Sequence, residues 1–289
     1  MKQKLIRITT VPISLGGLLQ GQSKFMSQFY EVVGISSDKE NLEKVGAKEE
    51  IRVIPVNLTR KITPIQDLKA LITLYKILRK EKPFIVHSHT PKAGTIGMMA
   101  ARMAGVPHRL HTIAGLPLVE ATGLKRVLLN AVEKLTYSCA TKVYPNSVGL
   151  QEIVLDHKFT NTKKLKVIGH GSSNGIDTSY FDPSLYSTAT KLELRKKLKL
   201  TDDDFVFVFV GRLVGDKGIN ELIAAFKKIL EEHTNVQLLL VGNPEEELDP
   251  MLPETEEFIF KSDKVIATGW ADDVRPYFAI SDCLTFPSY

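Results

Sequence analysis

Short apolar stretches rich in β-branched residues alternate with longer segments of helical periodicity. In the first part of the chain, strands are expected at residues 5–10, 31–36, 51–56, 84–88, 109–113 and 142–144. Helices are expected at residues 64–82, 93–104 and 123–139. In the first of these helices, the apolar residues expected on one face are Leu68, Leu71, Ile72, Tyr75 and Leu78. This alternation predicts an α/β fold in which helices cover a parallel sheet.

A second alternation runs through the last part of the chain. Strands are expected at residues 205–210, 236–241, 264–267 and 283–286, and helices at residues 219–232 and 274–280. Residues 169–187, rich in Gly and Ser, are predicted to be a linker. The expected architecture is two doubly wound domains, residues 1–172 and 173–289, with ligand between the carboxyl ends of the two sheets. Because the sequence stops just after the last expected strand, before any helix that could cover it, the second domain is expected to be incomplete.

The formal net charge of +5 conceals a difference between the two halves of the chain. Residues 1–175 contain 26 Lys and Arg against 12 Asp and Glu, whereas residues 176–289 contain 12 against 21. The basic half favours an anionic membrane surface, a nucleic acid or an anionic substrate as partner. Lys125 and Arg126, at the start of an amphipathic helix, favour the membrane, although an ordinary solvated helix face explains them equally well. Nucleic acid is disfavoured, because no basic stripe with interleaved aromatic residues is present.

Composition and motifs also limit the compartment and the chemistry. The 43% hydrophobic content is that of a globular protein, and no apolar run has the length of a membrane span. Arg7 interrupts any signal-peptide core, and the two cysteines, Cys139 and Cys283, are expected to be reduced, so a cytoplasmic protein is expected. The chain has no Gly-x-Ser-x-Gly elbow, Walker A motif or His-Glu-x-x-His motif, which argues against hydrolases, P-loop ATPases and zincins.

The strongest candidate for chemistry is the segment Gly211–Gly218, which lies between a predicted strand and a predicted helix. Its glycines allow the backbone to approach a ligand closely. Arg212 offers a bidentate fork, Lys217 offers a point charge, and the helix adds its positive end. The segment therefore predicts a site that holds a diphosphate. A tight turn with two solvated cations is the alternative.

The first half of the chain offers weaker candidates. Gly16 and Gly17 follow the first strand and either approach a ligand or form a plain turn. His87 and His89 alternate at the end of a strand, where they could hold a metal ion, but the further ligands that such a site needs are not evident. His111 also lies near a strand end and is either a residue of the ligand cleft or a structural histidine.

Several short stretches occur in a consistent order along both halves. They are Thr10–Ser14, His87–Gly94, His111–Thr112, Asn174–Asp177, Phe181, Gly211–Leu213, Lys217–Gly218, Leu240–Gly242, Gly269–Val274 and Ser281–Ser288. In this order and spacing they resemble a retaining glycosyltransferase of family 4, with the GT-B fold of two Rossmann-like domains that face a cleft. Each stretch alone is a weak indication of the family, and only the set as a whole carries the resemblance.

The resemblance implies transfer of a sugar from a nucleotide-linked donor, expected to be a UDP-sugar, to a lipid-linked or saccharide acceptor. It assigns the acceptor to the first domain and the donor to the second. Similar bacterial enzymes assemble capsule, O-antigen or exopolysaccharide. Two other possibilities remain open: a nucleotide-sugar 2-epimerase, and a non-catalytic module that binds a nucleotide sugar and depends on a partner.

The resemblance also implies roles for individual residues. Arg212 and Lys217 neutralise the leaving diphosphate, so neither a metal ion nor another cofactor is expected. His111 contacts the donor sugar near its reacting carbon. The positions assigned to the donor site are Gly16, Gly17, Gly211, Gly242 and Trp270.

One departure from the family affects the expected activity. The family has two glutamates, seven residues apart, after the Pro-Ser-Tyr stretch, and the chain ends at Tyr289, before both of them. These glutamates hold the donor sugar and the ribose. The chain is therefore expected to be a fragment or a natural truncation, with weak or no transferase activity in the second case.

Overall fold

The computed structural model describes residues 2–116, 118, 121–245 and 249–288. The chain forms two compact units, Met1–Gly175 and Ile176–Tyr289. The boundary predicted from the sequence, after residue 172, lies close to this division. Each unit is described by itself.

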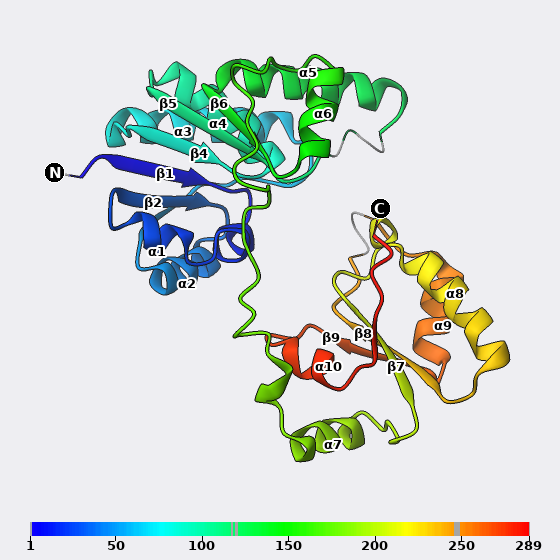
Figure 1. Cartoon of the computed structure of the whole chain (residues 1–289). Coiled ribbons are helices and arrows are strands. Elements are labelled where there is room, and N and C mark those ends of the chain that lie inside the picture. Colours follow the sequence, from blue (N-terminus) through cyan, green and yellow to red (C-terminus); the bar gives the residue numbers. More distant parts are fainter. Residues whose placement is uncertain (1, 117, 119–120, 246–248, 289) are drawn as a thin grey trace. The chain divides into compact units, whose positions relative to one another are not determined.

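The first unit contains a six-stranded parallel sheet in the order β3-β2-β1-β4-β5-β6 (Figure 1). Its strands are β1 (Lys4–Ile8), β2 (Glu31–Ser36), β3 (Arg52–Pro55), β4 (Ile85–Ser88), β5 (His108–Ile113) and β6 (Lys142–Pro145). This order is that of the Rossmann fold, and its direction reverses between β1 and β4. Ligands of such sheets bind outside the carboxyl ends of the strands at this reversal.

Helices cover both faces of this sheet. They are α1 (Gln22–Met26), α2 (Lys39–Glu49), α3 (Pro64–Glu81), α4 (Pro91–Met103), α5 (Gly123–Cys139) and α6 (Val148–Asp156), with a π-helical turn η1 (Ser14–Leu18) after β1. The main core joins Ile6 and Ile8 of β1 to residues of α3, α4 and α5. A smaller cluster around Leu15 and Leu42 packs η1 and α2 against the opposite face. The α/β architecture expected from the alternating pattern is thus confirmed.

Helix α3 differs from its predicted packing. Ala70, Leu74 and Leu78 are its buried residues, whereas Leu68 and Ile72, expected on the buried face, are 58% and 47% exposed. The prediction for these two residues was wrong, because α3 has apolar residues on more than one side and periodicity alone does not show which side packs. One apolar side of α3 therefore faces solvent.

The second unit contains a four-stranded parallel sheet in the order β10-β7-β8-β9. Its strands are β7 (Phe205–Val210), β8 (Val236–Val241), β9 (Val265–Gly269) and β10 (Cys283–Leu284). Its helices are α7 (Thr188–Lys197), α8 (Ile219–Glu232), α9 (Pro253–Lys261) and α10 (Arg275–Ala279), with short 3-10 turns η2 (Pro183–Leu185) and η3 (Gly215–Lys217). Separate apolar clusters lie beneath α8 with α9 and beneath α7 with α10. As in the first unit, the strand order reverses beside the first strand, here between β7 and β10.

No helix among the described residues combines the length and the apolar character needed to cross a bilayer.

Candidate functional site

Two glycines bring the loops after β7 and β8 into direct contact. The amide of Gly211 donates to the carbonyl of Val241 at 2.9 Å, and the amide of Gly242 donates to the carbonyl of Gly269 at 2.9 Å. A Cβ atom on Gly242 would lie 1.9 Å from the carbonyl oxygen of Gly211. Both glycines also have φ in the region that favours glycine, +154° for Gly211 and +146° for Gly242. Packing between these two loops therefore explains why glycine is found at both positions, whether or not a ligand binds there.

The rest of the glycine segment forms the tight turn η3 before α8. Gly218 has a left-handed φ of +69°, and a Cβ atom there would lie 2.3 Å from the carbonyl oxygen of Pro287. The amide of Asp216 donates to the carboxylate of Asp249 at 2.5 Å. The turn is thus held between the residues after β10 and those after β8. It lies at the reversal of strand order between β7 and β10, where α/β sheets bind ligands.

The two cationic residues of this segment, Arg212 and Lys217, differ in their contacts. The guanidinium of Arg212 is paired with the carboxylate of Glu245 and lies 3.5 Å from that of Asp216. Among the described residues, no hydrogen bond or ion pair involves the ammonium of Lys217. Helix α8 starts directly after Gly218 without a side-chain cap. The uncapped helix start and Lys217 therefore offer positive charge to an anion, whereas Arg212 has to share its guanidinium with carboxylates.

Trp270 lies after β9, in the loop before α10. Its side chain is 63% exposed, and its indole nitrogen donates to the carboxylate of Asp272 at 3.0 Å. The next carboxylate, Asp273, accepts from the amide of Arg275 at 3.0 Å and pairs with its guanidinium at 2.7 Å. These hydrogen bonds hold the pKa of Asp273 below its ordinary value. The open face of Trp270 is available to a ligand.

Gly16 and Gly17 lie in η1 and have different surroundings. A Cβ atom on Gly16 would lie 3.0 Å from Val45 of α2, so this glycine allows η1 to pack against α2. A Cβ atom on Gly17 would meet nothing within 4 Å, and its carbonyl accepts from the side chain of Asn174 at 3.0 Å. Of the two predicted positions, Gly17 is therefore the one open to a ligand.

His111 lies inside the first unit. It is 3% exposed, and its Nδ1 atom lies 2.8 Å from the hydroxyl of Ser88. Its ring lies beneath α4, where a Cβ atom on Gly94 would come within 2.4 Å of it. Burial lowers the pKa of His111 to about 4. The sequence placed this residue near the end of its strand, and strand alternation turns its side chain towards the face of the sheet on which α4 packs.

A pair of histidines lies on the other face of the sheet, next to a buried arginine. Arg7 and His87 are neighbours in the register of β1 and β4, and the His87 and His89 ring centroids are 3.9 Å apart. Nε2 of His87 lies 2.8 Å from the hydroxyl of Thr112. Burial, followed by the charge of nearby cations, holds the pKa of both histidines well below the ordinary value. Both rings are therefore neutral near pH 7.

The buried arginine was missed at the sequence level. Arg7 is 5% exposed, and its Nη1 atom donates to the side-chain oxygen of Gln22 at 3.2 Å. Burial lowers its pKa to about 10, an effect that Glu49 opposes. The sequence signal was present, because a single arginine interrupts the apolar strand Leu5–Ile8. Among the residues that the structure describes, no group of three or more potential ligands is placed to hold a metal ion.

Comparison with known proteins shows which family this architecture belongs to. A family model described as "Glycosyl transferase 4-like" matches residues 19–147, and one described as "Glycosyl transferases group 1" matches residues 190–289. The chain is 36% identical over 289 residues to the capsular polysaccharide biosynthesis glycosyltransferase CapM of Staphylococcus aureus, a match that covers 99% of the chain and 73% of CapM. The chain belongs to the family 4-like glycosyltransferases.

Other relatives of this glycosyltransferase agree with that assignment. It is 34% identical over 236 residues to the UDP-Gal:alpha-D-GlcNAc-diphosphoundecaprenol alpha-1,3-galactosyltransferase of Escherichia coli, which covers 80% of the chain and 58% of that relative. Anabaena HepE in complex with UDP and glucose has a TM-score of 0.74 at 16% identity, over 98% of this chain and 74% of that one. The sucrose-phosphate synthase of Thermosynechococcus elongatus has a TM-score of 0.73 at 19% identity, and the match covers 100% of this chain and 76% of that one. These structures confirm the predicted GT-B fold.

Proposed function

We propose that this glycosyltransferase moves a sugar from a UDP-linked donor to a lipid-linked or saccharide acceptor in the synthesis of a surface polysaccharide. The observation that carries the proposal is the similarity to CapM over 99% of the chain. The E. coli relative is named for a UDP-linked donor and a diphosphoundecaprenol-linked acceptor, and HepE binds UDP. We further propose that the configuration at the anomeric carbon is retained.

The second unit supports a role in donor binding. In the proposed reaction, an acceptor hydroxyl loses its proton and its oxygen bonds to the anomeric carbon, the bond between that carbon and the diphosphate oxygen breaks, and negative charge develops on the leaving diphosphate. Lys217 and the uncapped start of α8 offer charge and amide groups for that diphosphate, and Arg212 adds a fork once it is freed from Glu245. We propose that these groups replace a metal ion, so that transfer continues in the presence of EDTA.

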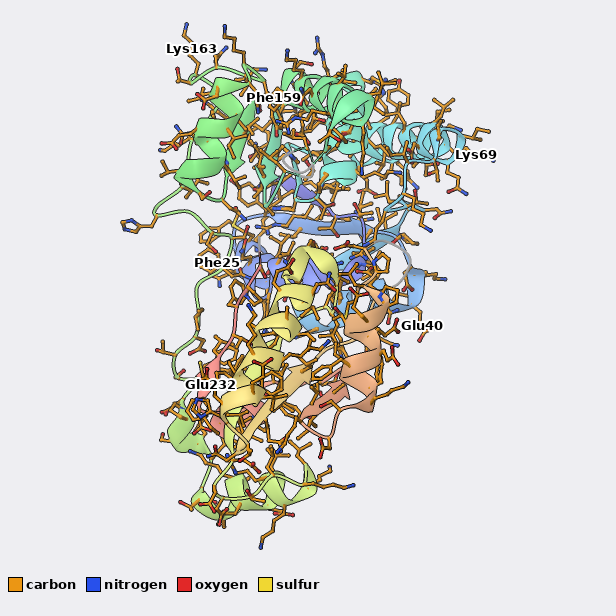
Figure 2. The ribbon with its side chains drawn as sticks, turned by 90° about the vertical axis from the view of Figure 1, so that its right-hand side faces the viewer. Phe25, Glu40, Lys69, Phe159, Lys163 and Glu232 are labelled. Atoms are coloured by element: carbon orange, nitrogen blue, oxygen red, sulfur yellow. The ribbon has the colours of Figure 1, made fainter. Side chains whose placement is uncertain are left out.

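The first unit supports attachment to an anionic membrane surface. The solvent side of α5 has an apolar stripe in which Leu124 is 89%, Val127 64% and Leu128 50% exposed. The outward side of α3 adds Ile65, at 74% exposed, together with Lys69, which projects outward (Figure 2). Apolar residues combined with cations on exposed helix faces suit the interface of an anionic bilayer, where a lipid-linked acceptor is found.

The decisive experiment is a transfer assay with defined substrates. The purified chain is incubated with a panel of UDP-sugars and a prenyl-diphosphate-linked N-acetylglucosamine, with and without EDTA. We expect UDP release and a glycosylated lipid only when both substrates are present, and NMR coupling constants that show retained anomeric configuration. Release of UDP with no dependence on acceptor contradicts the proposed transfer, and loss of activity in EDTA contradicts its metal independence.

Two outcomes would favour the other possibilities. Conversion of UDP-N-acetylglucosamine to its C2 epimer without any acceptor would indicate an epimerase, a class whose solved structures share the fold at TM-scores of 0.61. Binding of UDP without transfer to any acceptor would indicate a binding module.

A further inference from the structure

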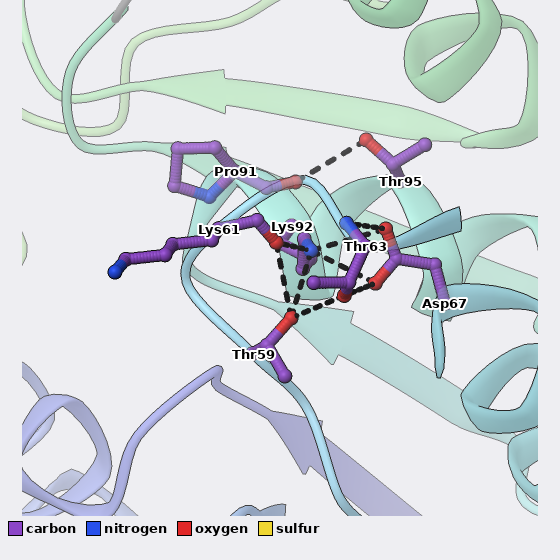
Figure 3. Close-up of polar contacts among 7 residues, drawn as sticks. All are labelled: Thr59, Lys61, Thr63, Asp67, Pro91, Lys92 and Thr95. Carbon is purple, nitrogen blue, oxygen red and sulfur yellow. Dashed lines mark hydrogen bonds and ion pairs between the residues drawn. The ribbon is translucent and has the colours of Figure 1, made fainter. Parts of the chain in front are cut away.

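The start of α4 is tied to the loop after β3 by one lysine. Nζ of Lys92 donates to the hydroxyl of Thr59 at 3.0 Å, to the carboxylate oxygens of Asp67 at 2.8 and 3.0 Å, and to the carbonyl of Lys61 (Figure 3). The lysine side chain is 13% exposed and the aspartate side chain 24% exposed. A partly buried ammonium with an anionic partner and several oxygen acceptors forms a stronger tether than an exposed ion pair.

Asp67 accepts hydrogen bonds from two different partners, Thr63 and Lys92. It accepts from the amide and the hydroxyl of Thr63, at 3.2 and 3.0 Å, which closes the start of α3. This local cap does not involve Lys92, which lies 25 residues further along the chain. Unlike the cap, the lysine therefore ties the loop of residues 57–63 to α4.

A second tether lies two residues before the lysine. The hydroxyl of Thr90 accepts from the amide of Thr10 at 3.0 Å and is 2.7 Å from its hydroxyl. Thr90 and Lys92 flank Pro91, the first residue of α4. The loops after β1 and β3 are thus both tied to the segment that follows β4, at the carboxyl edge of the sheet and beside the reversal of strand order.

The tethered loop presents apolar residues at this edge. Leu58 of the loop is buried, whereas Ile62 of the loop and Ile65 in the first turn of α3 are 64% and 74% exposed. Leu58 anchors the start of this loop in the core, whereas the exposed part around Ile62 has no such anchor and needs a polar restraint to keep one conformation. Lys92 supplies that restraint.

We propose that Lys92 is a positioning residue for the acceptor: it holds the loop of residues 57–63 at the carboxyl edge of the first unit as one wall of the acceptor site, with Ile62 and Ile65 against the lipid part of the acceptor. The inference rests on the proposed function, because the lipid-linked acceptor comes from there. It concerns only the first unit and leaves the donor groups of the second unit unchanged.

The kinetic test compares two lysine-to-methionine variants. Lys92→Met removes the tether but leaves the Thr63–Asp67 cap, and we expect the KM for the lipid-linked acceptor to rise about tenfold with kcat and the donor KM little changed. Lys4→Met is the matched control: Lys4 is also partly buried, at 19% exposed, and pairs with Glu81 at 2.6 Å, but it lies at the amino end of β1. We expect Lys4→Met to lower the melting temperature without a change in acceptor KM, and Lys92→Arg to restore most of the acceptor affinity. Equal effects of both methionine variants on acceptor KM overturn the inference.

A second measurement does not depend on turnover. Amide hydrogen exchange of residues 57–63 is followed in the full chain, with and without prenyl-diphosphate-linked N-acetylglucosamine. We expect the acceptor to slow exchange in this loop in the unmodified chain and not in Lys92→Met. Absence of protection in the unmodified chain overturns the positioning role even if transfer is observed. If protection appears without transfer, the proposed reaction fails and the acceptor-binding role of the loop stands.

Discussion

At the residue scale, the buried histidines of the first unit should make its stability sensitive to acid. The pKa of His89 lies well below 6.5 and that of His111 lies at about 4, in both cases because of burial. In the unfolded chain these groups bind protons near pH 6.5, whereas the folded chain resists protonation until the pH is lower. The free energy of unfolding should therefore fall below pH 6.5, by up to about 1.4 kcal/mol per pH unit for each histidine. Urea unfolding followed at pH 7.5 and pH 5 measures this slope.

The same experiment has an internal comparison. His111→Gln keeps a polar side chain of similar length but removes the titrating group, so its unfolding should depend less steeply on pH than that of the unmodified chain. An equally steep dependence in the variant would show that His111 is not the source of the effect.

Gly94 should tolerate no side chain, because His111 occupies the space. A Cβ atom at Gly94 would lie 2.4 Å from the imidazole. We expect Gly94→Ala to reduce the free energy of unfolding by about 1–3 kcal/mol, the usual cost of overpacking a core. Gly115→Ala is the control, because a Cβ atom there meets nothing within 4 Å. Thermal melts of both variants decide the matter, and equal melting temperatures would contradict the packing described here.

Lys217 should contribute more to UDP affinity than Arg212. The ammonium of Lys217 has no partner among the described residues, whereas Arg212 has to give up its contacts with Glu245 and Asp216 to reach a ligand. We expect Lys217→Met to weaken UDP binding about tenfold and Arg212→Met to weaken it less. Isothermal titration with UDP measures both. The reverse ranking would mean that the arginine is released at little cost.

These residues also show what a sequence can predict. Gly211 and Gly218 could be identified because glycines between a strand and a helix leave a pattern in the sequence, and Gly242 could be identified through the family resemblance. The environment of His111 could not, because helices cover both faces of the sheet and the sequence does not show that Gly94 of α4 packs directly on this side chain. Arg7 interrupts an apolar strand in the sequence, but its place beside His87 depends on strand order, which is a property of the folded sheet.

At the element scale, the exposed stripe of α5 should be the main contributor to membrane binding. Leu124 and Val127 face solvent and Lys125 adds positive charge beside them. We expect Leu124→Ser combined with Val127→Ser to abolish most co-sedimentation with vesicles containing anionic phosphatidylglycerol, and Lys125→Glu to weaken it in a salt-dependent manner.

The control for this experiment comes from the second unit. Phe260 of α9 is 60% exposed, and Phe260→Ser removes a comparable apolar side chain from a different helix. It should leave vesicle binding unchanged. Equal losses in both variants would indicate nonspecific adsorption rather than a docking surface on α5.

Helices were predicted unevenly. Helix α8 was predicted in full because its apolar face is continuous, with Leu222, Ile223 and Phe226 all buried. Helices α7 and α9 were not predicted: α7 has no fully buried residue, and Thr255 and Ile259 are the buried residues of α9. A hydrophobic pattern identifies a helix only when the helix has a broad contact with the core. The reverse error occurred in α3, where Leu68 and Ile72 are apolar and exposed.

At the scale of the whole molecule, the charge difference and the structural division coincide. The unit Met1–Gly175 contains 26 Lys and Arg against 12 Asp and Glu, and the unit Ile176–Tyr289 contains 12 against 21. The acidic second unit nevertheless presents Lys217 and the start of α8 at its glycine turn. A net charge is therefore a poor guide to donor binding, which depends on a few local groups, and a better guide to a membrane surface, which responds to the field of a whole unit.

This division also predicts how variants combine. The hydrogen bonds of Lys92 lie wholly within the first unit, and the turn that contains Lys217 lies wholly within the second. If one unit binds acceptor and the other binds donor, Lys92→Met and Lys217→Met share no partner, and their effects on kcat/KM should add to within about 0.5 kcal/mol. A double-mutant cycle on the transfer reaction measures the coupling. A coupling well above that value would mean that the tethered loop and the glycine turn act on the same substrate, which would contradict the assignment of acceptor and donor to separate units.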